Sequence, residues 1–324
     1  MKKYLYLILI LVLVFVTGCE KNKDKIIIYT AMEEERIQAM KEQVKEKFPE
    51  LNIVIEQVGT GNLAAKIKTE GSNIEADIVI DLEGAHMENL KDNFADLSNY
   101  DQSMYLDGIN PSHNKYFMWV KNHAALIINK DYFNEHNLDV PKTYEDLLSD
   151  KYKGLIAMPD PTTSGTGYSY YLNVVNLYGE EKAIEYFKNL NKANMKQFTE
   201  SGSGPISLLK QGEIAIAMGM SFQGAAEINN GSNYEIIELD TGAPYNVTGV
   251  SIIKGRENKN NIKEVFEWII KDFNKYDKEN FVPGKILKDQ VTRVPNYKDA
   301  TKDADMTGLS DIVLKNKLIE KWDI

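Results

Sequence analysis

Short apolar runs alternate with amphipathic segments along most of this chain. Residues 25–30, 52–57 and 76–81 are apolar stretches of strand length, rich in isoleucine and valine. Between them, residues 33–48 carry apolar side chains at helical spacing, and residues 62–70 predict a second helix. Strand and helix therefore alternate, which predicts an α/β fold with parallel-type sheets.

A second α/β region follows the first. Residues 117–120 and 124–128 are further apolar runs, and strand-like and helix-like segments then alternate as far as residue 239. The pattern from residue 260 onwards is mostly helical. We expect two lobes joined by a hinge around a cleft, because the chain crosses between them twice. The expected division is a first lobe over residues 26–122, a second lobe over residues 123–245, and a return to the first lobe with C-terminal helices over residues 246–324.

Two lysines, an apolar run and a single cysteine mark the N-terminus. Lys2 and Lys3 precede the apolar residues 4–16, which lead into Val16-Thr17-Gly18-Cys19. The run is shorter than the ~20 residues that a membrane-spanning helix needs. This order resembles the lipobox of a bacterial lipoprotein signal peptide. The resemblance implies removal of residues 1–18, a lipid on Cys19 that holds the protein at the cell membrane outside the cytoplasm, and a tether over residues 19–25. A buried structural cysteine is the alternative.

The composition argues against several classes of function. The 324 residues carry a formal net charge of −10 and few arginines, which disfavours binding to the phosphate backbone of nucleic acids. Cys19 has no second cysteine to pair with, so we expect no intramolecular disulfide. The sequence shows neither the Cys/His spacing of a metal site nor a nucleophile–base set. We therefore expect no metal, no cofactor and no catalysis.

Five strand-to-helix junctions share glycine and small hydroxyl residues. Helix N-termini present backbone N–H groups, while glycine and hydroxyl side chains let an anion approach and bind them. Ligands of open α/β sheets lie at this end of the strands. The junctions therefore predict a neutral binding site for a phosphoryl, phosphonate or carboxylate group, with simple helix capping as the alternative. They are Thr30-Ala31, Gly59-Thr60-Gly61, Thr163-Ser164-Gly165-Thr166-Gly167, Ser201-Gly202-Ser203-Gly204 and Ser221-Phe222-Gln223.

The stretch from Gly154 to Gly255 resembles the extracellular solute-binding proteins of ABC importers (the family 1 solute-binding superfamily), in particular the branch that binds 2-aminoethylphosphonate and other organophosphates. The resemblance implies a two-lobe periplasmic-binding-protein fold of type II, a monomer that closes on its solute and delivers it to a membrane permease. Permease and ATPase subunits would be separate chains. The motifs that carry it are Tyr152-Lys153-Gly154-Leu155-Ile156, Pro159-Asp160-Pro161, Ser164-Gly165-Thr166-Gly167-Tyr168, Gln197-Phe198-Thr199-Glu200-Ser201-Gly202-Ser203, Gly212-Glu213-Ile214-Ala215-Ile216 and Ser221-Phe222.

The same resemblance assigns candidate ligand-binding residues. Asp81 and Glu83 follow the third strand, where they either face a ligand ammonium group or cap the next segment. Tyr245 lies near the return crossover and either walls the cleft or packs in the interior. The candidates at the junctions are Thr30, Thr60, Gly61, Ser164, Gly165, Thr166, Ser203 and Ser221.

Ferric iron is the alternative solute, because relatives in this superfamily bind it. Those relatives carry adjacent tyrosines just after the strand that corresponds to residues 215–218, where this chain has Met220-Ser221-Phe222-Gln223. Tyr170 and Tyr171 are adjacent but lie in a predicted helix, where neighbouring side chains diverge by about 100°. The sequence therefore favours an organic phosphate or phosphonate over iron. An extracellular phosphoesterase is the alternative of a different class.

Overall fold

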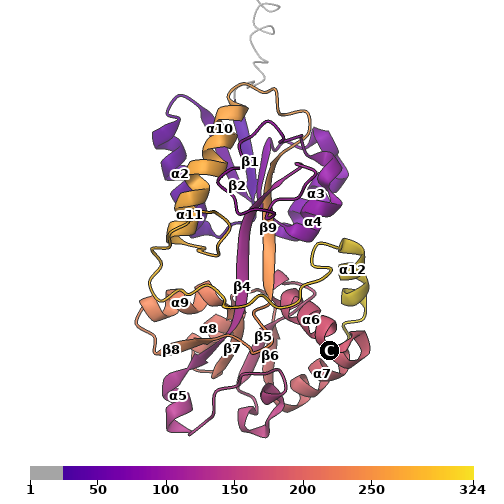
Figure 1. The fold of residues 1–324 in the computed structure, drawn as a ribbon, viewed down its shortest axis with the longest axis vertical. Coiled ribbons are helices and arrows are strands. Elements are labelled where there is room, and N and C mark those ends of the chain that lie inside the picture. The colour runs from indigo at the N-terminus through magenta and orange to yellow at the C-terminus, as the bar shows by residue number, and fades with distance from the viewer. Residues whose placement is uncertain (1–24) are drawn as a thin grey trace, which may run out of the picture.

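The computed structural model describes residues 25–324. The predicted signal peptide and Cys19 lie outside the described residues. Two lobes are stacked along the long axis of the molecule, and the strands β4 (Phe117–Asn129) and β9 (Tyr245–Ile252) run from one lobe into the other (Figure 1). The predicted two-lobe α/β architecture is confirmed.

The first lobe is built on a sheet with the strand order β2–β1–β3–β9–β4. Strands β2, β1 and β3 are mutually parallel, whereas β9 is antiparallel to β3 and β4. The expected parallel-type sheets are thus mixed, because the two strands that join the lobes run in opposite directions. The other elements here are β1 (Lys25–Thr30), α2 (Glu34–Lys47), β2 (Asn52–Gln57), α3 (Thr60–Glu70), β3 (Ile78–Glu83) and α4 (Gly84–Asn89).

The second lobe repeats this plan. Its strands follow the order β4–β7–β5–β6, with β8 on the other side of β4. β5 is parallel to β6 and β7, while β7 and β8 are antiparallel to β4. Its elements are α5 (Lys130–Glu135), β5 (Ile156–Pro159), α6 (Gly165–Tyr178), α7 (Glu180–Ala193), β6 (Met195–Thr199), α8 (Gly204–Lys210), β7 (Ile216–Met220), α9 (Ser221–Asn229) and β8 (Tyr234–Ile237).

Strand β4 belongs to both sheets. Its first half, as far as His123, pairs with β9, and its second half, from Ala124, pairs with β7 and β8. The sequence predicts a strand region here, with apolar runs at residues 117–120 and 124–128. The polar residues between the two runs, Lys121, Asn122 and His123, lie within the unbroken strand, where it passes between the lobes.

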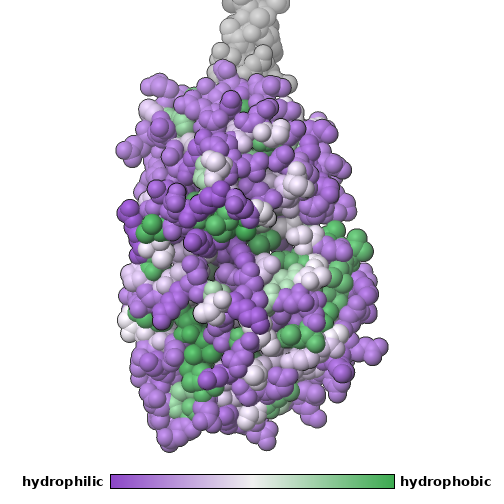
Figure 2. Space-filling model, viewed as in Figure 1, coloured by the Kyte–Doolittle hydropathy of each residue, from purple (hydrophilic) through white to green (hydrophobic). Residues whose placement is uncertain are grey.

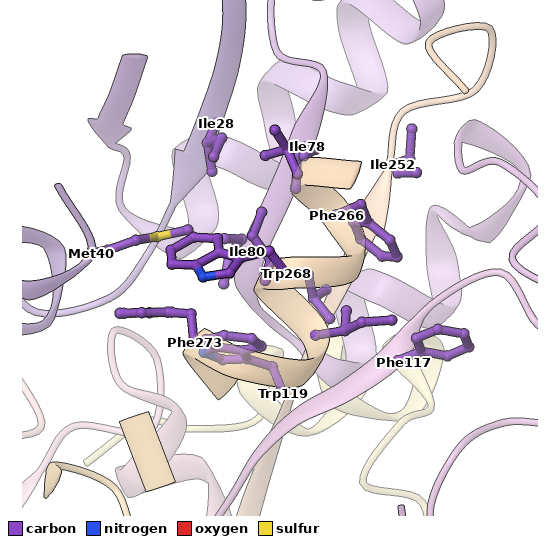
Figure 3. Close-up of a cluster of buried hydrophobic side chains, with 14 of the residues drawn as sticks. Ile28, Met40, Ile78, Ile80, Phe117, Trp119, Ile252, Phe266, Trp268 and Phe273 are labelled. Atoms are coloured by element: carbon purple, nitrogen blue, oxygen red, sulfur yellow. The ribbon is translucent and has the colours of Figure 1, made fainter. Parts of the chain in front are cut away.

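Each lobe has its own hydrophobic core. In the first, isoleucines of β1 and β3 pack against aromatic side chains of the C-terminal helices, and Trp119 stacks on Phe273 with ring centroids 6.1 Å apart (Figure 3). In the second, Tyr168, Tyr170 and Tyr171 of α6 are completely buried. Burial of apolar area at roughly 25 cal/mol per Å² makes these clusters the main source of stability.

The C-terminal segment contacts both lobes. The helices α10 (Ile262–Trp268) and α11 (Asn274–Asn280), joined by one π-helical stretch, return to the first lobe. The expectation of mostly helical structure is wrong for residues 281–311, which hold no helix. The last helix, α12 (Ile312–Glu320), packs Leu318 and the following Trp322 into the core of the second lobe. The chain therefore crosses between the lobes a third time.

On the face seen in Figure 2, the first lobe is mostly hydrophilic, whereas more hydrophobic residues gather on the second lobe. Within residues 25–324, no helix is long and apolar enough to cross a lipid bilayer.

Candidate functional site

A cavity of about 460 Å³ lies between the lobes. We call it the interlobe cleft. A second cavity, of about 350 Å³, shares Glu33, Phe222 and Ala226 with it and extends it along the first lobe. The cleft is lined by Glu33 of the first lobe, by Asn122 and Asn246 of the connecting strands, and by residues near three helix N-termini of the second lobe, which include Thr166, Ser203 and Gln223.

Two of the predicted junctions meet in this cleft. Ser164 caps α6, accepting a hydrogen bond from the N–H group of Gly167 at 3.5 Å, and it is nearly buried, like Thr166. Ser203 begins α8 and is exposed. A Cβ atom on Gly202 would lie 2.9 Å from Thr166 Oγ1 and 3.3 Å from Ser164 Oγ. The junctions therefore approach so closely that only glycine fits between them.

Gln223, on the first turn of α9, orients this part of the cleft. Its Oε1 accepts a hydrogen bond from the N–H group of Met220 at 3.0 Å, and its Nε2 donates to the carbonyl of Gly202 at 3.4 Å. The amide thus links α9 to the loop that precedes α8. A side-chain hydrogen bond therefore connects the starts of two helices of the second lobe.

Two asparagines that sequence reasoning missed come from the connecting strands. Asn122 of β4 lies opposite Asn246 of β9 in the antiparallel ladder, and both line the cleft. Asn246 Oδ1 is buried and has no hydrogen-bond partner within residues 25–324. Both asparagines are polar residues within strands that are otherwise largely apolar. This feature can be interpreted only once the strands are known to cross between the lobes.

The first-lobe wall contains a buried network of charges centred on Arg36. Its guanidinium donates to both carboxylate oxygens of Asp277, to Asp81 Oδ2 and to Glu33 Oε2, at 2.7 to 2.8 Å. Lys278 Nζ adds a contact to Asp277 at 2.7 Å and lies 5.1 Å from the ring centroid of Trp119. Of these carboxylates only Glu33 is exposed, and it faces the cleft.

Burial and ion pairing have opposite effects on the pKa values of the carboxyl groups in this network. Burial alone would raise the pKa of Asp277, but the nearby Arg36 and Lys278 outweigh it and hold that pKa below its usual value. Burial raises the pKa of Asp81 despite Arg36. Asp81 has a positive φ of 64° at the irregularity in the β3–β9 ladder, and Thr248 of β9 also donates to it. Its carboxylate is thus engaged within the protein.

Glu83, the other acidic candidate, lies where the lobes touch. Its carboxylate pairs with Lys315 of α12, and both side chains are largely buried. A Cβ atom on Gly165 would lie 3.9 Å from Glu83 Oε2 and 3.7 Å from Asn246 Nδ2. Thr60 Oγ1 accepts a weak hydrogen bond from the Glu83 N–H group at 3.4 Å. The start of α6, one edge of the cleft and the end of β3 therefore meet here.

Four predicted residues lie elsewhere. Thr30 is fully buried and its hydroxyl accepts from the N–H group of Met32. Gly61 is exposed on the first turn of α3. Ser221 lines a different cavity, which has a volume of about 400 Å³ and is lined by residues of β4, β8 and α9 and by residues 296–301. Tyr245 has its ring under Lys121 Nζ at 4.4 Å, on the face of the strands covered by residues 306–311.

The paired tyrosines are committed to the core. The Tyr170 hydroxyl donates to the carbonyl of Ala125 at 2.7 Å and lies 3.1 Å from the carbonyl oxygen of Gly219, and Tyr171 donates to the carbonyl of Leu318 at 3.3 Å. Burial raises the pKa of both phenols, that of Tyr171 to about 12. No tyrosine lines the interlobe cleft, and residues 25–324 contain no cluster of three or more His, Cys, Asp or Glu side chains suited to a metal ion.

Comparison with known families decides the class of protein. Residues 32–274 match the family model of bacterial extracellular solute-binding proteins. This chain belongs to that family. A Haemophilus influenzae protein of uncharacterised function is 35% identical over 132 residues, which span 41% of this chain and 38% of that curated relative.

Solved structures of periplasmic binding proteins share the fold of this solute-binding protein. The iron-bound protein HitA from Pseudomonas aeruginosa superimposes with a TM-score of 0.79 at 16% identity, over 93% of this chain and 99% of its own. AfuA from Actinobacillus pleuropneumoniae, solved with fructose-6-phosphate, gives 0.78 at 23% identity, over 92% and 97%. The protein P5PA gives 0.76 at 23% identity, over 92% and 98%. At these identities the likeness establishes the two-lobe fold.

Proposed function

We propose that this protein is the lipid-anchored receptor of an ABC importer, which captures a small anionic solute, an organic phosphate or phosphonate, in the interlobe cleft. The observation that carries the proposal is the convergence of Thr166, Gly202 and Ser203 in one cavity at the starts of α6 and α8. Backbone N–H groups and hydroxyls at helix N-termini bind oxyanions without needing a positively charged side chain. In the proposed transport cycle, the lobes close on the solute, and the protein then delivers it to a permease that works with an ATPase, both being separate chains.

The opposite wall suits a cation on the same solute. Glu33 is 62% exposed at the cleft, and its one salt bridge within residues 25–324 is to the buried Arg36. The group Glu33, Asp81, Asp277, Arg36 and Lys278 sums to one negative charge when all five are ionised. A solute with an anionic and an ammonium end would meet hydroxyl donors on one lobe and a carboxylate on the other.

The favoured solute class can be separated from iron in one screen. Thermal shift of the mature protein with phosphonates, sugar phosphates, glycerophosphodiesters and ferric citrate measures which ligand stabilises the folded form. We expect phosphonates or organic phosphates to raise the melting temperature. A tyrosinate-to-metal absorption band after ferric loading would contradict the proposal, as would steady turnover of a phosphoester.

The site itself is tested by Thr166→Ala. Calorimetry with the best ligand of the screen is expected to show about tenfold weaker binding, the equivalent of one lost hydrogen bond to a charged group. Tyr245→Phe is the control, because Tyr245 lies on the other face of the connecting strands. Unchanged affinity of the Thr166 variant would remove this loop from the proposed site.

A further inference from the structure

The start of α6, where the proposed function puts the solute's anionic group, already has a carboxylate beside it. Glu83 comes from the first lobe, at the end of β3, and its Oε2 lies 3.9 Å from the position of a Cβ on Gly165, the first residue of α6. Ser164 Oγ accepts only from the N–H group of Gly167, which leaves the N–H groups of Gly165 and Thr166 to other acceptors. A negative charge is favourable at this end of a 14-residue helix.

The carboxylate is held there by a charge from the far end of the chain. Lys315 of α12 pairs with Glu83, and the side chains are only 13% and 12% exposed. The same ammonium lies 4.9 Å from the ring centroid of Tyr168, one turn into α6. The Tyr168 hydroxyl is buried and has no hydrogen-bond partner in the described part of the chain. Lys315 is therefore placed to neutralise an anion at the start of α6, whichever molecule supplies it.

The pair also joins the two lobes. Leu318 and Trp322 fix α12 in the core of the second lobe, whereas Glu83 belongs to the first. Separating two largely buried, paired charges costs much free energy if neither finds a new partner. The contact thus favours the present approach of the lobes when no solute is bound.

From this arrangement, and on the basis of the proposed function, we infer that Glu83 acts as an internal competitor of the solute. The anionic group of an entering solute displaces the Glu83 carboxylate from the start of α6, and Lys315 then pairs with the solute. A neutral solute cannot make this exchange, because it would leave Lys315 unpaired. The pair therefore selects for anionic solutes and lowers the affinity with which they bind.

The test compares three variants with two probes, inorganic phosphate and 2-aminoethylphosphonate, by calorimetry. Glu83→Gln removes the competing charge, and we expect binding at least about fivefold tighter, the lower end of typical coupling between sites. Lys315→Met is expected to weaken binding by a similar factor and to reduce its dependence on salt. Lys317→Met is the matched control, because Lys317 lies on the same helix but pairs with Glu180 of the second lobe.

The outcomes separate this inference from the proposed function. If the wild-type protein and all variants bind neither these probes nor any phosphonate or organic phosphate of the thermal-shift screen, both the proposed function and the inference are overturned. If the wild-type protein binds a probe but Glu83→Gln leaves its affinity unchanged or weaker, only the competitor role is overturned. Lys315→Arg, which keeps the charge, covers the case in which Lys315→Met fails to fold. Near-normal affinity of Lys315→Arg for the probe supports a role for the positive charge. Near-normal affinity of a folded Lys315→Met variant overturns that role.

Discussion

Arg36 and Asp277 form a two-point ion pair between α2 and α11, with Nε to Oδ1 and Nη2 to Oδ2 both at 2.7 Å. Neither side chain is more than 4% exposed. The pair joins an early helix to one that returns to the first lobe after the strands of the second lobe. Because Arg36 also holds Glu33 at the cleft, the interior of the first lobe and the proposed solute site share one network.

Replacing Asp277 with asparagine is expected to destabilise the protein by about 3 to 5 kcal/mol, since it leaves Arg36 and Lys278 buried with less compensation. Urea unfolding followed by circular dichroism gives the free energy of unfolding. Lys275→Met is the control on the same helix, because Lys275 is 61% exposed and only 4.0 Å from its partner Glu279. Similar losses in the two variants would contradict a special role for the buried pair.

Stability is expected to fall as the pH rises from about 10 towards 12. Burial, and then the charges of Glu180 and Asp323, raise the pKa of Tyr171 to about 12, and burial raises that of Tyr100 likewise. The unfolded chain releases these phenolic protons near pH 10 while the folded protein keeps them, so rising pH favours unfolding. Urea midpoints at several alkaline pH values measure the effect. A midpoint that does not change in this range would contradict it.

Trp322→Ala is expected to cost about 2 to 3 kcal/mol, slightly less than a fully buried tryptophan, because Trp322 is partly exposed. Its ring contacts Tyr171, Phe187 and Phe198 with centroid distances of 4.9, 5.2 and 5.5 Å. Thermal unfolding measures the loss. Val313→Ala on α12, where the side chain is 74% exposed, should leave the melting temperature almost unchanged.

Gly202→Ala is expected to weaken solute binding by about tenfold, a cost of about 1.4 kcal/mol, because the new methyl group displaces Thr166. Gly61→Ala is the comparison: its Cβ meets nothing within 4 Å, and alanine favours helix α3 by up to about 1 kcal/mol. Calorimetry and thermal unfolding of both variants check this. Weaker binding in a fully stable Gly61→Ala protein would instead place Gly61 at the solute.

The sequence predicted those elements whose periodicity is strong. Residues 25–30 and 52–57 form strands with the predicted bounds, and α2 covers the predicted amphipathic segment. The predicted strand region over residues 117–128 is confirmed as β4, although Lys121, Asn122 and His123 interrupt its apolar run. Their polarity is explained by the place where the strand leaves one core and enters the other.

The sequence predicted which kinds of residue form the candidate site, but not which of the predicted residues line the cleft. Hydroxyl and glycine residues mark Thr166 and Ser203, which line the cleft, and equally Ser221, which faces another cavity. Composition at a junction does not say toward which side of a sheet a side chain points. The ion pair between Glu83 and Lys315 joins residues 232 positions apart, and nothing local to either residue indicates it.

The three crossings of the chain between the lobes affect how the protein unfolds. β4 supplies a strand to both sheets, and α12 completes the second core only after α10 and α11 have completed the first. No cut in the sequence separates the chain into two pieces that each hold an entire core. The lobes should therefore share one cooperative unfolding transition, so that damage in one lobe increases amide hydrogen exchange in the other.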